Sequence, residues 1–427
     1  MLSREDNDLL CLTGAGSTMG SLMRRYWIPF LLSSELPNAD SDPLRTTLLG
    51  ESLVAFRDTN GAVGLIQNNC PHRGASLFFG RNEEAGIRCV YHGWKFDVDG
   101  TCVDMPNEPA ESDFKHKVRA VAYPCRERGG IVWAYMGAPE SMPEMPDLEW
   151  ALVPDSHRLV SKRLQETNYA QAMEGGIDSS HVSFLHNDTT RGRRTDTNSG
   201  RYLRLDGAPK FEVVDTSYGF VIGARRLAEE DAYYWRITQW LFPFFQMIPP
   251  FGDGPISGHA WVPIDDEHCW TFSMTWHPRR PLTEAEVIFI EDGNSVHALK
   301  IPGTFRPVRN ATNDYMIDRE LQRSKRSFTG ITGISEQDTA VQESMGPIYD
   351  RTQERLGAAD AAIIQMRRRL MRAATELSQG IEPPALDPKV FRVRSVSMLL
   401  PRTVAAWPEA AREAMTAEPD RFFVSVA

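Results

Sequence analysis

Two short segments of the chain each carry one cysteine and one histidine at close spacing. The first reads Cys70-Pro-His72-Arg-Gly and the second reads Cys89-Val-Tyr-His92-Gly-Trp. Thiolates and imidazoles are ligands for zinc ions and for iron–sulfur clusters. The neighbouring proline and glycine residues indicate tight loops, because both residue types favour turns. The pattern therefore predicts a metal centre clamped between two loops.

Two identities fit such a ligand set. A Rieske [2Fe–2S] centre places two cysteines on one iron and two histidines on the other, whereas a structural zinc ion binds four ligands tetrahedrally. Zinc sequences usually keep like ligands paired, but here each loop supplies one cysteine and one histidine. The chain therefore resembles a Rieske iron–sulfur protein, with Cys70, His72, Cys89 and His92 as cluster ligands, and zinc is the alternative.

A second constellation contains His181 and His186. Non-haem ferrous oxygenases bind one Fe(II) through two histidines and a carboxylate, which leaves positions open for oxygen. At this i, i+5 spacing the two histidines do not share one side of a regular α-helix. We therefore expect a π-type bulge or a helix break between them, as is common at functional sites.

Both constellations together resemble the oxygenase (α) component of Rieske non-haem iron aromatic-ring hydroxylating oxygenases. The segments Arg25–Pro29, Ile131–Met136 and Asn168–His186 are similar to the phthalate dioxygenase group of that family, which also includes aryl-ether O-demethylases. The resemblance covers essentially the whole chain. It implies a [2Fe–2S] cluster, a mononuclear Fe(II) and an aromatic substrate that reacts with O2.

The same resemblance implies a third iron ligand, an aspartate far downstream near the start of a helix. The run Gln337-Asp338, followed by Glu343-Ser-Met-Gly-Pro347, is similar to the group's pattern and favours Asp338. The other candidates are Asp314, Asp318, Asp350 and Asp360.

Asp178 precedes His181 by three residues, so both side chains can face one side of a helix. The carboxylate can then accept the Nδ1–H of His181 and orient its ring. In the family, the matching aspartate also contacts a cluster histidine of a neighbouring subunit and carries the electron path. The resemblance thus implies that Asp178 bridges to the partner subunit's His92, in a homotrimer or in stacked trimers.

The elements that must position these residues predict an α+β protein. We expect an N-terminal helical segment over 1–43, with helical spacing from Thr18 to Trp27, and an all-β Rieske domain over 44–137. A proline-rich boundary leads into a catalytic domain over 147–427, which we expect to contain a curved antiparallel sheet packed with helices.

Within the catalytic domain, the pattern predicts one helix over 167–185 and two hairpins. The first hairpin pairs 218–227 with 232–241, and the second pairs 258–264 with 269–277. In the last strand, large apolar residues alternate with threonine and serine, which predicts a single buried face. The stretch from 314 to 377 has helical spacing, and Arg367–Arg369 is expected to be a solvated face.

Composition bounds the possible functions. The 427 residues carry a formal net charge of −10, which argues against nucleic acid as a partner. The N-terminus has no signal-peptide pattern, and the most apolar stretch, 240–251, is too short and proline-rich to span a bilayer. Of the 6 cysteines, the four outside the two loops show no disulfide-like spacing, namely Cys11, Cys102, Cys125 and Cys269, so the cytoplasm is the expected location.

We therefore predict a terminal oxygenase that hydroxylates an aromatic compound, such as a substituted benzoate or phthalate-like carboxylate. The alternative is O- or N-demethylation of a methoxylated or N-methylated aromatic, which would use the same iron. No G-x-G-x-x-G turn for a nicotinamide is present, so a separate NAD(P)H-dependent reductase is expected as a partner. Rival classes are a Rieske ferredoxin and a zinc-stabilised binding protein.

Two groups of residues are candidates for the substrate pocket. Phe242, Phe244, Phe245 and Met247 are candidates for an apolar lining. A buried substrate carboxylate needs a cation, best an arginine that binds it in bidentate fashion. The candidate arginines are Arg191, Arg193, Arg194, Arg225, Arg226 and Arg236.

Overall fold

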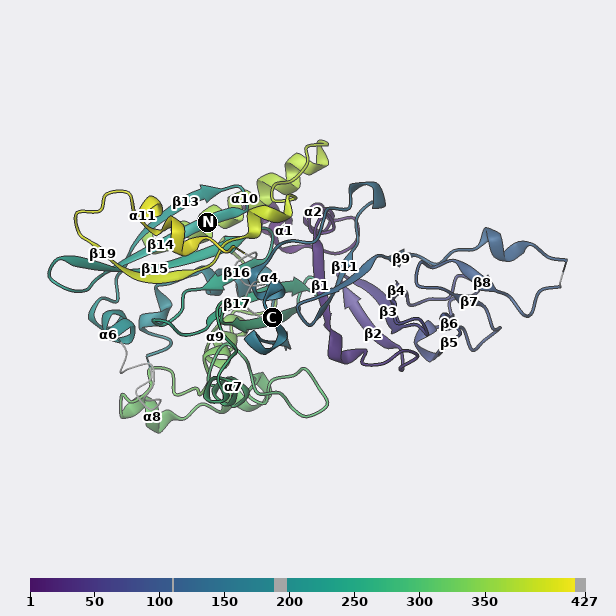
Figure 1. Cartoon of the computed structure of the whole chain (residues 1–427), viewed down its shortest axis with the longest axis horizontal. Helices are drawn as coiled ribbons and strands as arrows, with labels where there is room; N and C mark the ends of the chain where they lie inside the picture. The colour runs from purple at the N-terminus through teal and green to yellow at the C-terminus, as the bar shows by residue number, and fades with distance from the viewer. Residues whose placement is uncertain (110, 188–197, 419–427) are drawn as a thin grey trace.

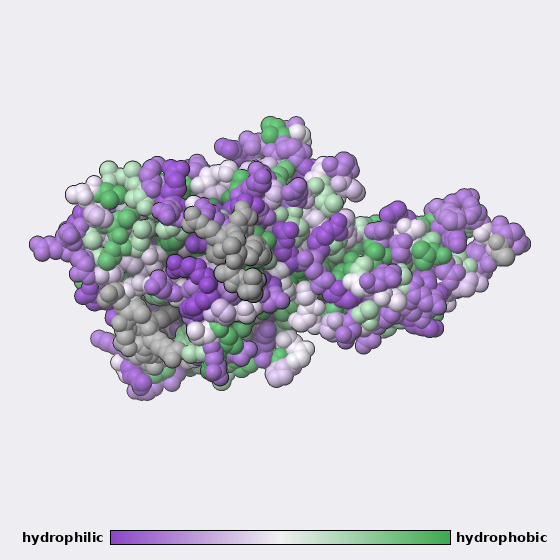
Figure 2. Space-filling model, in the orientation of Figure 1, coloured by the Kyte–Doolittle hydropathy of each residue, from purple (hydrophilic) through white to green (hydrophobic). Residues whose placement is uncertain are grey.

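The computed structural model describes residues 1–109, 111–187 and 198–418. Figure 1 shows an elongated molecule with a large sheet and its helices on one side and small β-sheets at the other end. On the face drawn in Figure 2, hydrophilic residues predominate and hydrophobic ones occur in scattered groups. No helix in these described ranges is long and apolar enough to cross a membrane.

The N-terminal segment begins with two short helices, α1 (Arg4–Cys11) and α2 (Thr18–Met23), and continues as strand β1 (Trp27–Leu32). The helical spacing expected up to Trp27 therefore ends four residues early. Trp27 instead pairs with Tyr135 of β11 (Ile131–Tyr135), which also pairs with β10 (Cys125–Arg128). Tertiary pairing and the β-favouring residues of this stretch override its local helical pattern.

Two small antiparallel sheets carry the cysteine–histidine loops. One has the order β2-β3-β4-β9 and the other has the order β5-β6-β7-β8. Their bounds are β2 Leu44–Leu48, β3 Glu51–Arg57, β4 Val63–Gln67, β5 Arg81–Glu83, β6 Gly86–Arg88, β7 Lys95–Phe96, β8 Cys102–Asp104 and β9 Ala122–Tyr123. The two sheets enclose a small core of their own, in which Cys70, Cys89 and Trp94 are buried.

The large sheet has eight antiparallel strands in the order β12-β18-β17-β16-β15-β14-β13, with β19 paired to β15. The strands are β12 Arg158–Gln165, β13 Lys210–Thr216, β14 Gly219–Leu227, β15 Ala232–Leu241, β16 Phe245–Ile248, β17 Ile256–Pro263, β18 Cys269–Trp276 and β19 Val396–Pro401. The two hairpins expected from the sequence are present as β14–β15 and β17–β18.

The helices of this part are α3 Glu149–Leu152, α4 Tyr169–Ile177, α6 Asn198–Leu205, α7 Glu284–Glu291, α8 Arg319–Arg323, α9 Ile334–Glu343, α10 Ala361–Ser378 and α11 Trp407–Met415. Helix α4 contacts β17 on the sheet and also contacts α9. Strand β18 is buried on both faces, so the single buried face expected from its alternation is wrong. Its serine and threonine side chains are covered because they face the elements that build the site.

Arg367 on α10 also corrects an expectation, because it is buried and not solvated. Its Nε lies 2.8 Å from Glu174 Oε1 on α4, and its Nη1 lies 2.5 Å from Glu354 Oε1. Arg351, which is also buried, lies 3.0 Å from the same oxygen of Glu174. This ion network fixes α4 against α10, whereas Arg368 beside it is exposed.

Candidate active site

The two cysteine–histidine loops have the same backbone geometry. Gly74 N–H donates to Cys70 O at 2.9 Å, and Gly93 N–H donates to Cys89 O at 3.0 Å. Both glycines have a left-handed φ, +78° and +80°, which residues with a Cβ rarely adopt. Each loop thereby closes on itself four residues after its cysteine and presents the histidine in between.

Like side chains of the two loops lie next to each other. The ring centroids of His72 and His92 are 4.5 Å apart, and Cys70 interacts with Cys89. Burial, together with the nearby Cys89, raises the pKa of the Cys70 thiol to about 11. His92 Nδ1 is buried and has no hydrogen-bond partner, which fits a nitrogen that binds a metal.

The loops fit two irons better than one zinc ion. Around a tetrahedral ion, all four ligand atoms would lie within about 4 Å of one another, given the bond lengths of zinc. In the described ranges, no three ligand atoms of these loops lie within 4.8 Å of one another. A cysteine pair beside a histidine pair is the distribution that a Rieske cluster requires.

The second constellation is built where helix α4 ends. The helix stops at Ile177, and Asp178 has an extended backbone with ψ of 112°. Asp178 Oδ1 accepts the Ser180 N–H at 2.6 Å, which turns the chain into the short 3-10 helix η6 (His181–Ser183). Helix α4 thus ends before both histidines, because the Asp178 side chain competes for the backbone as an Asx turn. The short helix that carries His181 then ends at Ser183, so a helix break also lies between His181 and His186, as expected.

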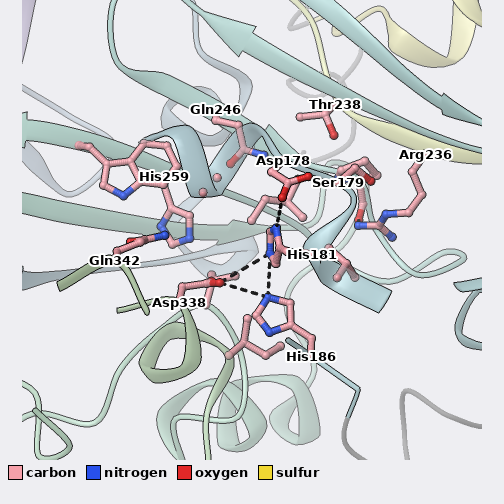
Figure 3. A pocket seen from close by; sticks show the side chains of 18 of the residues that line it. Asp178, Ser179, His181, His186, Arg236, Thr238, Gln246, His259, Asp338 and Gln342 are labelled. Atoms are coloured by element: carbon pink, nitrogen blue, oxygen red, sulfur yellow. Dashed lines mark hydrogen bonds and ion pairs between the residues drawn. The ribbon is translucent and has the colours of Figure 1, made fainter. Parts of the chain in front are cut away.

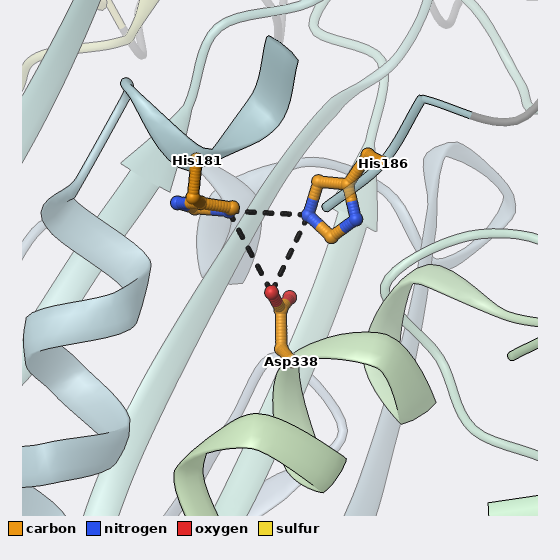
Figure 4. A group of neighbouring side chains, drawn as sticks. All are labelled: His181, His186 and Asp338. Carbon is orange, nitrogen blue, oxygen red and sulfur yellow. Dashed lines mark hydrogen bonds and ion pairs between the residues drawn. The ribbon is translucent and has the colours of Figure 1, made fainter. Parts of the chain in front are cut away.

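His181, His186 and Asp338 point at one another (Figure 4). The two histidine Nε2 atoms are 3.1 Å apart, and Asp338 Oδ1 lies 3.6 Å from His181 Nε2 and 3.4 Å from His186 Nε2. Asp338 comes from α9, which packs against α4. Two imidazoles and one carboxylate on one side of a cavity are the ligand set of a non-haem Fe(II) centre.

The other candidate aspartates lie apart from this group and serve local backbone roles. Asp318 caps α8 by accepting the Glu320 N–H, and Asp314 is exposed in the turn before it. Asp350 accepts the Thr352 N–H, and Asp360 accepts the Gly357 N–H.

Each histidine of the triad is held at its outer nitrogen. Asp178 Oδ2 lies 3.5 Å from His181 Nδ1, and Gln337 Oε1 lies 2.7 Å from His186 Nδ1. Gln337 Nε2 donates to Ile331 O at 2.8 Å, so its oxygen faces the ring and the ring Nδ1 donates. Both contacts leave the Nε2 lone pairs for a metal, which is the usual support of metal-binding histidines.

The histidines of the triad lower the pKa values of Asp338 and of the neighbouring Asp178. Burial raises the pKa of Asp338, but the neighbouring His186 and His181 outweigh this and lower it overall. Burial likewise raises the pKa of Asp178, and the hydrogen bond from His181 lowers it overall. Gln337 was not among the expected site residues; its position directly before Asp338 was the available signal.

The triad opens into a cavity between the large sheet and helices α4 and α9 (Figure 3). Its lining residues are Arg163, Gly175, Gly176, Asp178, Ser179, His181, Val182, His186, Arg236, Thr238, Gln246, Ile248, Pro249, Phe251, His259, Trp261, Val296, Ile334, Asp338 and Gln342. A Cβ at Gly176 would lie 2.1 Å from a ring carbon of Trp261, so the glycine lets this indole form a wall.

The stretch 240–251 does contribute to the cavity, through Gln246, Ile248, Pro249 and Phe251, but not through the four residues that were expected to line it. Phe242, Phe244, Phe245 and Met247 pack in the main hydrophobic core. Gln246 and Ile248, which alternate with the last two of these, line the cavity instead. Successive strand residues point to opposite faces, so the cavity face of β16 carries the residues between the large apolar ones.

The candidate arginines separate into different environments. Arg236 lines the cavity, and Arg226 donates to Ser179 O at 2.6 Å behind the cavity wall. Arg225 lies over the Tyr233 ring at 4.5 Å, on the opposite face of the sheet. Arg191, Arg193 and Arg194 lie outside the described residues.

Comparison with known proteins gives two family matches that together span most of the chain. The Rieske [2Fe–2S] domain matches residues 26–124, and the domain described as LigXa C-terminal domain like matches residues 134–418. The expected α+β class, with an all-β cluster domain followed by a sheet-and-helix domain, is confirmed. Dicamba monooxygenase is a solved structure of similar fold, with a TM-score of 0.58 at 18% identity over 84% of this chain and all of its own.

Three oxygenase subunits are similar along nearly the whole chain. The 3-chlorobenzoate-3,4-dioxygenase subunit of Comamonas testosteroni is 40% identical over 95% of this chain and 96% of its own. The phthalate 4,5-dioxygenase subunit of Pseudomonas putida is 42% identical over 89% and 88%. The 5,5'-dehydrodivanillate O-demethylase subunit of Sphingobium sp. is 32% identical over 98% and 90%.

Proposed function

We propose that this chain, which belongs to the Rieske non-haem iron oxygenases as an oxygenase subunit, oxidises an aromatic carboxylate whose anionic group binds Arg236. Membership of this family brings a [2Fe–2S] cluster, a mononuclear iron and a separate reductase, and it excludes the ferredoxin and zinc-protein alternatives. The observation that carries the substrate assignment is a buried guanidinium without a carboxylate partner in the same cavity as the iron triad.

Arg236 is 3% exposed. Its Nη2 donates a hydrogen bond to Pro249 O at 3.2 Å. Its Nη1 is buried without a hydrogen bond, and the guanidinium lies 5.0 Å from the centroid of the Phe251 ring. No aspartate or glutamate of the described ranges forms an ion pair with it. Because an unpaired buried charge costs several kcal/mol, a substrate carboxylate is the missing partner.

Arg226 adds a second positive charge behind the first. It is 1% exposed, and its Nε and Nη1 have no hydrogen-bond partner. Burial, and then the charge of Arg236, lowers the pKa of Arg226 to about 10. An anion bound at Arg236 would relieve this repulsion, so both arginines favour an acidic substrate.

The remaining cavity residues suit an aromatic ring. Trp261, Phe251 and Ile248 supply flat or apolar surface, while Thr238 stands beside Arg236 at the polar end (Figure 3). Dioxygenases of 3-chlorobenzoate and of phthalate are among the relatives, and both of those substrates are aromatic carboxylates. This agreement supports the substrate class that the arginines indicate.

We assign the cluster to Cys70, His72, Cys89 and His92, and the mononuclear iron to His181, His186 and Asp338. When bound, the cluster supplies single electrons, and the iron brings O2 next to the substrate. The protein's own task is to hold the ring against Trp261, to hold the carboxylate at Arg236 and to fix the two histidine rings through Asp178 and Gln337.

We also propose a homotrimer, in which Asp178 approaches the cluster of a neighbouring subunit. The sheets β5–β8 beside the cluster loops lie at the far end of the chain from α6 and α8 of the catalytic part (Figure 1). Tyr91, next to His92, is 55% exposed and available to a neighbouring subunit.

We further propose a cytoplasmic location, which is supported by the 6 cysteines, all of which are free.

O- or N-demethylation is the second candidate, favoured by the similarity to the O-demethylase subunit. Both reactions would use the same triad, and they differ in product. A panel of benzoates, phthalates and methoxylated benzoates, assayed with a surrogate reductase under labelled O2, separates them. Ring dioxygenation incorporates both labelled atoms, whereas demethylation of a methoxy group releases formaldehyde.

The carboxylate assignment is tested by Arg236→Met. Loss of a buried charge partner costs about 2 kcal/mol or more, so the Kd of the preferred carboxylate should rise at least about 30-fold. Arg225→Met is the matched control, because Arg225 faces away from the cavity and should leave the Kd unchanged. Equal affinities of wild type and Arg236→Met for every carboxylate in the panel would refute the assignment.

A further inference from the structure

We propose that His259, together with Gln246, forms a hydrogen-bond acceptor site in the cavity that selects a substrate carrying a hydroxyl or amino group on its aromatic ring. This inference rests on the proposed function and narrows its substrate class. It concerns a second polar region of the cavity, formed by strands β16 and β17, whereas Arg236 comes from β15.

The tautomer of His259 follows from its hydrogen bonds. Ser273 has one hydroxyl hydrogen, which it donates to Val296 O at 3.0 Å. His259 Nδ1 lies 3.1 Å from the same Ser273 oxygen. Since the serine has no second hydrogen to give, the ring Nδ1 must carry the proton and donate it. Neutral His259 therefore keeps an unprotonated Nε2, which is an acceptor.

His259 also stays neutral. It is 6% exposed, and burial, followed by the charge of Arg163, lowers its pKa to about 3. The charges that face it are Arg163 from β12 and Asp338 from α9. His297 is buried nearby and hydrogen-bonds to Ser161 and Thr275, and burial lowers its pKa as well. The ring thus offers a lone pair and no positive charge.

Gln246 stands directly opposite His259 in the register of β16 and β17. Directly opposed residues of an antiparallel pair have Cβ atoms about 5 Å apart on one face of the sheet. Gln246 is 2% exposed, lines the same cavity, and its Oε1 has no hydrogen-bond partner. Among the described residues, Gln246 Oε1 therefore lacks a donor, and it lies on the same face of the sheet as the His259 ring.

These acceptors specify the chemistry of the group that they bind. A second carboxylate has no hydrogen to donate to the His259 and Gln246 acceptors, which disfavours it. An unsubstituted ring would leave the buried acceptors unpaired, at about 1–3 kcal/mol. A ring hydroxyl or amino group supplies the missing hydrogen, and sites built to bind such a group discriminate strongly against analogues that lack it.

The test compares matched ligands on the anaerobic holoenzyme by calorimetry, so it does not depend on turnover. The ligands are 3- and 4-hydroxybenzoate, the 3- and 4-methoxybenzoates, which keep the oxygen but lose its hydrogen, and benzoate. We expect at least one hydroxybenzoate to bind about 5-fold or more tightly than both benzoate and its methoxy partner.

The variants His259→Phe and Gln246→Leu should each reduce that selectivity ratio toward one, and Gln353→Leu, an exposed glutamine far from the cavity, should leave the ratio unchanged. If benzoate, hydroxybenzoate and methoxybenzoate bind wild type equally and all depend on Arg236, the acceptor site is refuted and the proposed function stands. If neither the benzoates nor the phthalates of the panel bind wild type, the proposed function itself is refuted.

Discussion

The amide of Gln337 is the support of the iron triad that can be tested most cleanly. Gln337 is 3% exposed, accepts from His186 Nδ1 at 2.7 Å and donates to Ile331 O at 2.8 Å. In Gln337→Leu, the His186 Nδ1–H loses its acceptor in a place where water cannot replace it. The side chain of leucine is of similar size, so the helix α9 and Asp338 should stay in position.

The expected loss of Fe(II) affinity follows from the two hydrogen bonds that Gln337→Leu removes, with His186 and with Ile331. A buried donor left without an acceptor costs about 1–3 kcal/mol, and this cost falls on the ring orientation that iron needs. The affinity for Fe(II) should therefore drop about 10- to 100-fold, which is the range found when the outer partners of metal-binding histidines are removed. Gln337→Glu restores an acceptor oxygen and should retain more affinity than Gln337→Leu.

The assay is competition for Fe(II) between the anaerobic protein and a coloured chelator, with the Rieske electron paramagnetic resonance signal as an internal measure of folded protein. Gln342→Leu is the matched control. Gln342 is a buried amide on the same helix that accepts from Gln165 at 2.6 Å, and the hydrogen bonds of the described residues do not join it to either histidine. An unchanged Fe(II) affinity in Gln337→Leu, or an equal loss in Gln342→Leu, would refute the reasoning.

Two further changes separate electron delivery from stability. Asp178→Asn should leave both metal centres loaded but slow single-turnover oxidation of the pre-reduced cluster, since Asn keeps the size of Asp178 and loses its charge beside His181; a wild-type rate would leave Asp178 with a structural role only. Arg367→Met should lower the free energy of unfolding by about 3–5 kcal/mol, because it leaves the buried Glu354 without its ion-pair partner and weakens the pairing of the partly buried Glu174. The exposed neighbour Arg368→Met should change little, and equal denaturation midpoints of the two variants would contradict the ion network.

Local patterns in the sequence were sufficient for the elements that depend on near neighbours. The hairpin β14–β15 has the expected ends to within one residue, because alternation and an acidic turn determine it locally. The cysteine–histidine loops were equally readable, since their glycines and ligands lie within six residues of each other in each loop. The Rieske oxygenase family, which these motifs indicated, is confirmed by the relatives.

Features that depend on distant parts of the chain could not be predicted from local sequence patterns. The burial of Arg367 depends on Glu174, which lies far away in the sequence and meets it only after α4 packs on α10. The end of α4 depends on whether the Asp178 side chain or the next helical turn satisfies the Ser180 N–H. Both alternatives are compatible with the residue types, and tertiary packing decides between them.

The residues that line the cavity were harder to identify than the metal ligands, because the large sheet is covered on both faces. A strand with water on one side shows its core face by alternation, and β18 alternates in that manner. Here its Ser273 and Thr275 hydrogen-bond to His259 and His297 inside the protein. The polar residues of β18 therefore lie on the face toward the iron and the substrate, and its large apolar residues lie on the face toward the core. In a sheet covered on both sides, polar residues at alternate positions are the signal of a site.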